Sequence, residues 1–396
     1  MSSTLVQEKL AQATQVLNEL DIDLWMVVAR ESDVLGDPSL PLILGTSVTW
    51  ESFFLVTKSG QHVAVVGTGD VENVKQTRAW VNVVSYVQGP RERLREEIER
   101  INPSQIALNF APDNVMADGL THGMYLRLQQ MLSDTPYLER VVTGEPIVSK
   151  MRSRKSAEEQ RRIRAAIATT NDIWDRLAEW IRPGVSEKEI ADFMHAQLER
   201  RGVRAAWDWH YCPGVTAGPD SPIGHVGPTD VTIERGQLLT LDFGVRQDDY
   251  TSDMQRTYYL LAEGETDAPA PVEDAFRIIS GVIQDAAKIL KPGVAGWEVD
   301  RVARETFERE GLEEWGYALG HQIGRAVHDG GCLLGPRWER YGQRPYDLVE
   351  QDQVFTLEIA TNVPGYGRVS LEEDVVVTED GCEFLSPPQT EPILIG

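Results

Sequence analysis

The first part of the chain alternates short apolar runs with stretches of helical periodicity. Val6, Leu10, Leu17 and Leu20 recur at helical spacing and predict a helix within residues 1–20. Apolar runs that are typical of strands follow at residues 24–29, 52–67, 81–87 and 105–110, and the run at 52–67 contains a turn at residues 58–60. Helices are predicted at residues 90–101 and 124–132. This alternation predicts an α/β domain over residues 1–148.

The second part of the chain combines longer helices with strands that form hairpins. Helices are predicted at residues 156–181, 186–201, 271–290 and 297–310, and Pro-Gly pairs follow two of them. Ser186 followed by Glu189 has the spacing of a capping box. Strands are predicted within residues 237–261, 354–361 and 369–378. We therefore expect an α+β domain over residues 149–396, with an antiparallel sheet and helices packed on one face.

Composition narrows the class of protein. A chain of 396 residues exceeds the usual size of a single core, which favours two domains. A formal charge of −24 argues against nucleic acid and anionic membranes as partners. Three scattered cysteines form no disulfide framework or zinc ribbon and fit a reducing compartment. The chain shows neither a signal peptide nor a membrane-spanning apolar run, so we expect a soluble, cytoplasmic protein.

Two aspartates occur in the first predicted hairpin, at residues 237–261. Asp242 lies in one strand-like run and Asp253 in the next, around a polar turn. Direct pairing of the two would centre the turn between Gln247 and Asp248 and place their Cβ atoms about 5 Å apart. Opposed like charges destabilise a sheet unless a cation lies between them. The pattern therefore predicts a metal site.

The second predicted hairpin carries another pair of acids. Glu358 and Glu372 lie in successive strands, and direct pairing would centre the turn on Gly365. Most acids on strands face solvent, and that interpretation fits Glu373 and Asp374 better than it fits Glu358. Glu358 lies between apolar neighbours, where a carboxylate needs a partner. We therefore interpret Glu358 as a metal ligand.

Three of the histidines are candidates for the same site. His321 and His328 lie in a glycine-rich segment that allows backbone to approach a site closely. Their spacing of seven would place both on one face if the segment were helical. His225, just before the first hairpin, is a third candidate. Structural or surface roles are expected for the remaining four, His62, His122, His195 and His210.

The candidate ligands combine carboxylates with a single imidazole, and they are Asp242, Asp253, His321, Glu358 and Glu372. An oxygen-rich set with a single nitrogen suits Mn²⁺ and also admits Co²⁺, Fe²⁺ or Zn²⁺. The four carboxylates of this set carry enough negative charge to neutralise two divalent ions. Such ions lie about 3.5–4 Å apart and activate a bridging water for hydrolysis.

Residues 151–381 resemble the pita-bread metallohydrolases, which include methionine aminopeptidase, aminopeptidase P, prolidase and creatinase. The matching motifs are TLDFG (240–244), TSDMQRT (251–257), GHQIGRAVHD (320–329), FTLE (355–358) and LEEDVVVTEDG (371–381). The α/β domain ahead of them resembles the creatinase-type N-terminal domain. The resemblance therefore narrows to the aminopeptidase P, prolidase and creatinase branch.

The resemblance implies a role for each ligand. Asp242 would bind one metal ion, His321 and Glu358 the other, and Asp253 and Glu372 would bridge both. Glu358 would also act as general base. His225 and His328 would not bind the metal ions. They would orient the substrate and stabilise a tetrahedral intermediate.

The leading prediction is a two-metal hydrolase that cleaves an Xaa-Pro peptide or dipeptide bond, and the resemblance also implies a homodimer. One alternative is a creatinase-like or other non-peptide C–N hydrolase or lyase, and another is a non-catalytic metal-binding relative. The chain departs from many peptidases of this fold at Asp329, at Ile359-Ala360 and at Ser370. Arg is common at the position of Ser370, and the nearest arginine in this chain is Arg368. The sequence therefore leaves the substrate open between peptide and small molecule.

Overall fold

The computed structural model of the protein describes residues 3–224 and 226–396. They form two compact units, Met1–Arg152 and Ser153–Gly396. The division falls at the end of helix α6 (Glu145–Ser153). The sequence placed this boundary between residues 148 and 149.

A six-stranded mixed sheet forms the centre of the first unit, with strand order β4-β3-β2-β1-β5-β6. The strands are β1 (Leu24–Ala29), β2 (Ser52–Thr57), β3 (Val63–Gly67), β4 (Asn82–Tyr86), β5 (Ile106–Leu108) and β6 (Val141–Thr143). The helices are α1 (Ser3–Glu19), α2 (Leu40–Ile43), α3 (Val71–Gln76), α4 (Arg91–Ile101) and α5 (His122–Leu132), with 3₁₀ turns at Thr68–Asp70, Val115–Ala117 and Pro136–Arg140.

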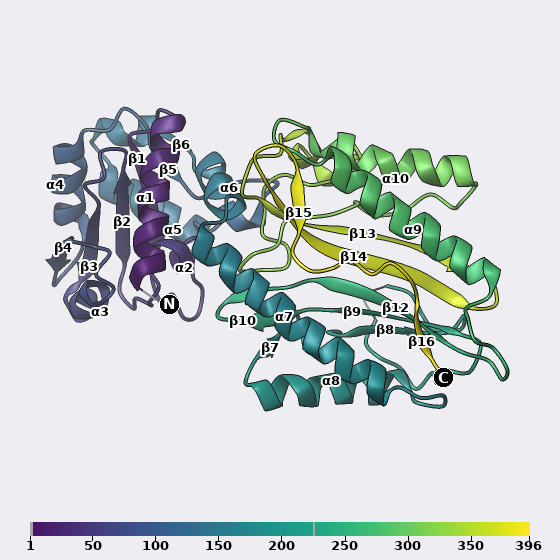
Figure 1. The fold of residues 1–396 in the computed structure, drawn as a ribbon. Helices are drawn as coiled ribbons and strands as arrows, with labels where there is room; N and C mark the ends of the chain where they lie inside the picture. The colour runs from purple at the N-terminus through teal and green to yellow at the C-terminus, as the bar shows by residue number, and fades with distance from the viewer. Residues whose placement is uncertain (1–2, 225) are drawn as a thin grey trace. The chain divides into compact units, whose positions relative to one another are not determined.

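Strand β1 shows why this unit has three layers. Its side chains alternate between the two faces of the sheet. Trp25 and Val27 join an apolar cluster with residues of α1, whereas Leu24 and Met26 join a second cluster with residues of α4 and α5. Helices therefore cover both faces (Figure 1). This is the α/β domain that the sequence predicts.

The second unit contains a larger sheet, with strand order β13-β14-β12-β9-β8 and antiparallel pairing along that path. Its strands are β8 (Gly214–Ala217), β9 (Leu238–Phe243), β12 (Met254–Leu260), β13 (Val354–Val363), β14 (Gly367–Val377), β15 (Cys382–Phe384) and β16 (Ile393–Ile395). A small separate sheet joins β7 (Arg204–Ala205), β10 (Val245–Gln247) and β11 (Tyr250–Thr251).

Helices pack on the apolar face of the larger sheet. Ile359 and Leu371 join a cluster with residues of α9 (Ala270–Ile289) and α10 (Gly296–Glu310). Leu239 and Leu241 join another with residues of α7 (Ala157–Trp180) and α8 (Glu187–Arg201). Figure 1 shows α9 and α10 beside β13 and β14, and α7 and α8 near β8 to β10. The predicted antiparallel sheet with helices on one face is confirmed.

Local sequence signals account for several boundaries in this unit. Ser156 and Ser186 each accept a hydrogen bond from the backbone N–H of the glutamate three residues later, as capping boxes at the starts of α7 and α8. Two 3₁₀ turns, Glu339–Tyr341 and Arg344–Tyr346, lie between α10 and β13.

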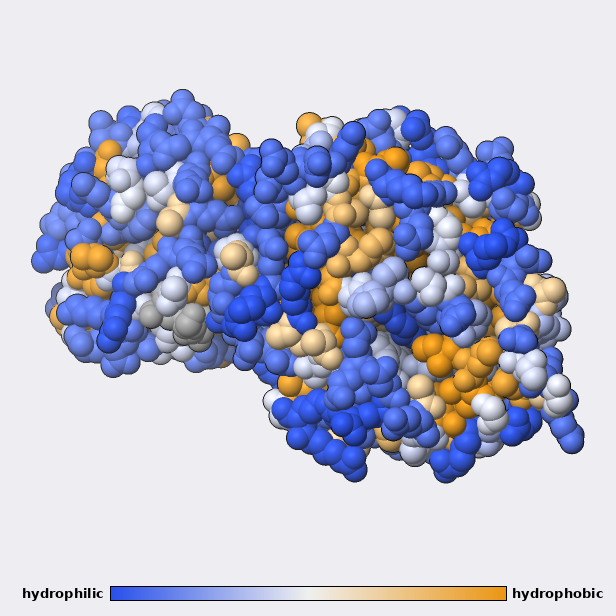
Figure 2. Space-filling view, viewed as in Figure 1, coloured by the Kyte–Doolittle hydropathy of each residue, from blue (hydrophilic) through white to orange (hydrophobic). Residues whose placement is uncertain are grey.

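The outer surface is mostly hydrophilic on the face shown in Figure 2, with apolar areas between the charged residues. Across the residues that the structure describes, no helix combines the length and the apolar character needed to span a membrane.

The first predicted hairpin register is wrong, because the partner of Asp242 lies two residues further along the chain than predicted. Gln247 pairs with Tyr250, and Asp242 pairs with Gln255 instead of Asp253. Asp248 and Asp249 form the two-residue turn with φ angles of 49° and 69°, the left-handed conformation that such hairpin turns require. The turn is therefore centred one residue later than predicted.

The second hairpin has the predicted register. Glu358 pairs directly with Glu372, and Gly365 in the connecting turn has a φ angle of 83°. Gly365 follows Pro364 at the position of this turn that favours glycine.

Candidate metal centre

A row of paired residues crosses four neighbouring strands of the larger sheet. Glu358 pairs with Glu372, Glu372 with Gln255, and Gln255 with Asp242. Directly paired residues project to the same face of a sheet. This face is opposite the one that carries Ile359 and Leu371, which pack on the helices. The sheet therefore aligns three acids from distant parts of the chain.

Asp253 joins the same face from the residue just before β12. Asp253 lies two residues before Gln255, so its side chain projects to the same face of the sheet. Because Gln255 pairs with Asp242, Asp253 is a diagonal neighbour of Asp242. The two aspartates thus belong to one site although they are not directly opposed.

His321 reaches the row from a segment that runs beside β13. The backbone N–H of His321 donates to Thr356 Oγ1 at 3.2 Å, and Thr356 N–H donates to the His321 carbonyl at 2.9 Å. The approach depends on Gly320, where an added Cβ would lie 2.0 Å from the Thr356 carbonyl oxygen. Glycine is required here because the two backbones are so close.

The imidazole of His321 faces three carboxylates. Its Nε2 lies 3.9 Å from Asp253 Oδ2, 3.7 Å from Glu358 Oε1 and 3.9 Å from Glu372 Oε1. For Asp253, His321 and Glu372, the potential ligand atoms all lie within 4.8 Å of one another. Side chains at this spacing can converge on a single ion.

Burial makes these carboxylates hard to ionise without a cation. Burial raises the pKa of Asp242 to about 7, and burial together with the charge of Asp242 raises the pKa of Glu358 to about 8. Burial and neighbouring acids hold the pKa values of Asp253 and Glu372 well above their usual range. Burial lowers the pKa of His321 to about 3. The imidazole is therefore neutral at pH 7, as a metal ligand must be.

The residues present fit divalent cations. Asp242 Oδ1 is buried and accepts no hydrogen bond from the residues that the structure describes. A buried anionic oxygen without a donor is costly, and a metal ion removes that cost. An oxygen-rich set with one neutral imidazole also matches the preferences of Mn²⁺ and related ions.

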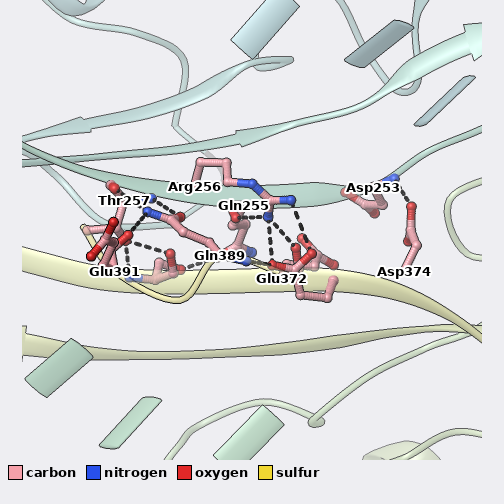
Figure 3. Close-up of polar contacts among 10 residues, drawn as sticks. Asp253, Gln255, Arg256, Thr257, Glu372, Asp374, Gln389 and Glu391 are labelled. Carbon is pink, nitrogen blue, oxygen red and sulfur yellow. Dashed lines mark hydrogen bonds and ion pairs between the residues drawn. The ribbon is translucent and has the colours of Figure 1, made fainter. Parts of the chain in front are cut away.

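Gln255 and Asp374 are parts of the site that sequence reasoning missed. Gln255 Nε2 donates to Glu358 Oε2 at 3.4 Å, and Gln255 Oε1 accepts from Ser370 Oγ. Asp374 Oδ2 accepts from the backbone N–H of Asp253 at 3.3 Å (Figure 3). The period of two along TSDMQRT places Gln255 on the face of Asp253, and this signal alone could have identified it.

The prediction that Glu373 and Asp374 face solvent is wrong. Glu373 is 1% exposed and Asp374 is fully buried. Arg256 Nη1 lies 3.0 Å from Glu373 Oε1, and its Nη2 lies 3.1 Å from Oε2. The backbone N–H of Gln389 donates to Glu373 as well, at 2.8 Å. Partners far away in the sequence therefore stabilise these acids inside the protein.

His328 lies beside His321, as the sequence suggested, but the segment between them is not helical. Their ring centroids are 4.5 Å apart and their planes meet at 79°. The N–H of Asp329 donates to the Gln322 carbonyl at 2.8 Å and folds the segment back. Asp329 also forms a buried ion pair with Lys155 at 3.0 Å. His225 lies outside the described residues.

The other histidines have contacts of a structural kind or lie at the surface. His195 stacks on Trp209 with ring centroids 3.8 Å apart, and its Nε2 lies 2.8 Å from the Cys212 carbonyl oxygen. In the first unit, His62 Nδ1 accepts from the backbone N–H of Thr57 at 3.2 Å. His122 and His210 are exposed.

Comparison with known families identifies the group to which this site belongs. The profile of metallopeptidase family M24 matches residues 161–379, more than half of the 396 residues. The chain belongs to metallopeptidase family M24. The family prediction is thereby confirmed, and it makes the protein a metal-dependent hydrolase of the peptidase class.

Relatives of this M24 protein include peptidases named for a substrate and peptidases that are uncharacterized. It is 28% identical over 283 residues to the uncharacterized peptidase YqhT of Bacillus subtilis, covering 70% of this chain and 73% of that protein. It is 26% identical over 249 residues to an Xaa-Pro dipeptidase of Pyrococcus furiosus, covering 62% and 67% of the two chains.

Solved structures show the same fold over the full chain. An Xaa-Pro dipeptidase from Bacillus anthracis has a TM-score of 0.75 at 21% identity and covers 98% of this M24 protein and 99% of its own chain. An X-Pro aminopeptidase from Thermotoga maritima has a TM-score of 0.72 at 23% identity, with coverage of 98% and 99%. The predicted pita-bread fold with its N-terminal α/β domain is confirmed.

Proposed function

We propose that this M24 protein is a two-metal hydrolase that cleaves an Xaa-Pro bond. The observation that carries the proposal is the set of buried acids around a neutral imidazole on one face of the sheet. Such a set ionises fully near neutral pH only with cations bound, and two divalent ions would balance its charge. Relatives that are named for Xaa-Pro cleavage support the substrate class.

Each ligand has a place in this proposal. Asp242 would hold one ion, and His321 and Glu358 would hold the other, with Asp253 and Glu372 contributing to the binding of both. Bound ions, Mn²⁺ first among them, would supply a water of lowered pKa and polarise the scissile carbonyl. The donor set also admits Co²⁺, Zn²⁺ or Fe²⁺.

Glu358 is the proposed general base. Its Oε1 lies toward His321, and its Oε2 accepts from Gln255 at 3.4 Å, so the carboxylate is held by contacts on both sides. It takes the proton of the attacking water and then passes it to the leaving nitrogen. His328 is exposed next to His321 and is the proposed donor to the tetrahedral intermediate, with His225 as the second.

A hydrolase of a small non-peptide C–N bond is the second candidate. The observation that favours it is Ser370, which binds Gln255 at a position where peptidases of this fold often have Arg. The buried pair Ile359-Ala360 replaces Pro-Gly after the proposed base.

A substrate panel with added Mn²⁺ tests the proposal. We expect hydrolysis of Xaa-Pro dipeptides or longer Xaa-Pro peptides, and loss of activity with a chelator. The variant Asp253→Asn should lose at least 100-fold in kcat, about the effect of removing a central catalytic group, while Asp274→Asn on the exposed side of α9 serves as control. Turnover of small amidines without any peptide cleavage would support the second candidate. Activity unaffected by chelation would contradict both.

A further inference from the structure

A buried ion pair adjoins the loop that carries His328. Lys155 Nζ lies 3.0 Å from Asp329 Oδ2, and the two side chains are 0% and 4% exposed. Asp329 directly follows His328 in the chain. Taking two charges out of water is costly, so a pair this deeply buried persists only with close geometry. Neither residue of the pair is a metal ligand or the general base in the function proposed above.

The backbone fixes the Lys155 end of the pair. Lys155 precedes Ser156, the N-cap residue of α7. The N–H of Lys155 also donates to the Asp352 carbonyl at 2.8 Å, two residues before β13 begins. The ammonium of Lys155 therefore projects from a point that is tied both to α7 and to the strand that carries Glu358.

The ion pair contacts the loop at Gly324. A Cβ added to Gly324 would lie 2.2 Å from Asp329 Oδ2 and 2.7 Å from Lys155 Cε, so only glycine leaves room for the pair. The Gly324 carbonyl accepts from the backbone N–H of Thr251 at 2.8 Å and from its hydroxyl at 3.1 Å. Thr251 lies two residues before Asp253. The loop is thus joined to the ion pair and to the strand that leads to a proposed metal ligand.

The loop folds back on its own start at Asp329. The N–H of Asp329 donates to the Gln322 carbonyl at 2.8 Å, and Gln322 forms an antiparallel bridge with Phe355 of β13. Asp329 is therefore fixed by its backbone as well as by its side chain. His328 is exposed, and its ring centroid lies 4.5 Å from that of His321. Because an exposed ring has few packing contacts, the position of His328 depends on the backbone that Asp329 fixes.

We propose that Lys155 is a positioning residue that fixes His328 beside His321 through the ion pair with Asp329. The proposal rests on the function proposed above, in which His328 donates to the tetrahedral intermediate. A donor that is displaced by about 1 Å costs about 100-fold in rate. Because its side chain is fully buried, Lys155 acts through Asp329 and not by touching the substrate. Asp329, a position at which the chain departs from many peptidases of this fold, thereby acquires a role.

Neutralising the pair tests the proposal. The variant Lys155→Met/Asp329→Asn removes both charges, so that no buried charge is left without its partner. We expect kcat for an Xaa-Pro substrate to fall about 10–100-fold. Binding of Mn²⁺ should not change, because neither residue is a ligand. A kcat equal to that of the wild-type protein would overturn the proposal. A loss of Mn²⁺ would overturn it too, since the pair would then act on the metal centre.

A further substitution separates positioning from a general effect on the fold. His328→Gln alone should lower kcat about 100-fold, the usual effect of removing one donor to a tetrahedral intermediate. If the pair acts only through His328, adding Lys155→Met/Asp329→Asn to His328→Gln should change kcat less than about 2-fold. Independent effects would multiply instead, and that result would overturn the proposal.

The matched control is Lys58→Met/Asp23→Asn, which makes the same substitutions in a lysine–aspartate pair of the first unit. It should leave kcat unchanged. If the variant at residues 155 and 329 does not fold, Asp329→Ala replaces it, because a buried lysine without a partner can release its proton. The same loss of kcat is expected, and it should again disappear in the His328→Gln background. Wild-type kcat in Asp329→Ala would overturn the proposal.

An NMR measurement needs no turnover and separates this inference from the function itself. The full-length protein is loaded with diamagnetic Zn²⁺, which the same donors admit, and the ring signal of His328 is identified by its loss in His328→Gln. If the wild-type protein hydrolyses no Xaa-Pro substrate, the proposed function fails. The positioning role then stands if Lys155→Met/Asp329→Asn shifts the His328 signal and leaves that of His195 in place. It fails if the His328 signal is unchanged or if the His195 signal moves as well.

Discussion

The buried acids of the larger sheet differ in what neutralises them. Glu373 has a guanidinium from the chain itself, since Arg256 binds both of its oxygens. Burial and the charges of further acids raise the pKa values of Asp253 and Glu372, and neither carboxylate has a guanidinium partner among the described residues. Acids of the first kind stabilise the fold when paired, whereas acids of the second kind need a cation from outside.

Removing Arg256 tests the structural pair. Arg256→Met leaves the carboxylate of Glu373 buried without its partner, which usually costs about 3–5 kcal/mol of unfolding free energy. Arg277→Met removes an exposed pair with Asp274, which is worth about 0–1 kcal/mol. Urea-induced unfolding followed by circular dichroism measures both. A loss in Arg256→Met no larger than in Arg277→Met would show that the buried pair does not stabilise the protein.

At the scale of elements, strand register decides how much of the site the sequence reveals. The Pro364-Gly365 turn has a strong local signal, so the pairing of Glu358 with Glu372 was predicted correctly. The Asp248-Asp249 turn lacks glycine, so the sequence carries no such signal there, and the predicted turn was placed one residue too early. Burial of Glu373 depends on Arg256, more than a hundred residues earlier, and no local pattern could show it.

Substituting Gly365 tests the hairpin that aligns Glu358 with Glu372. Its φ is 83° and an added Cβ would meet nothing within 4 Å, so Gly365→Ala adds backbone strain alone. We expect a loss of about 1–2 kcal/mol of unfolding free energy. Gly281→Ala has equal space but lies within helix α9, where it should gain up to about 1 kcal/mol. Opposite shifts in the urea midpoint would confirm the interpretation, and equal shifts would refute it.

At the scale of the whole molecule, element order was the most predictable feature. Alternating strands and helices in the first unit, and hairpins with long helices in the second, follow from periodicity and turn residues. The substrate was not predictable, because the shape of a substrate pocket depends on side chains that come together only in the fold.

The stability of the metal-free protein should depend on pH, and bound metal should remove that dependence. Without metal, folded Asp242 and Glu358 have pKa values of about 7 and about 8, whereas unfolded carboxyls titrate near 4. The folded state therefore binds more protons, and stability falls as pH rises through these values. His321 is neutral in both states above its unfolded pKa of about 6.5, so it does not contribute there.

Melting temperatures measured from pH 6.5 to 8 test this dependence. Chelated protein should melt several degrees lower at the upper end of the range, and added Mn²⁺ should abolish the difference. The chelated variant Glu358→Gln should depend less on pH than the chelated wild-type protein. A chelated protein that becomes more stable toward pH 8 would contradict the assigned pKa directions.

The central claim is that the paired acids and His321 hold two divalent ions. Equilibrium dialysis against Mn²⁺, followed by elemental analysis, measures this directly and needs no substrate. We predict close to two ions per chain for the wild-type protein and a clear loss in Asp253→Asn that leaves the circular dichroism spectrum unchanged. Dialysed wild-type protein without bound Mn²⁺, or an Asp253→Asn variant that retains two ions, would contradict the account.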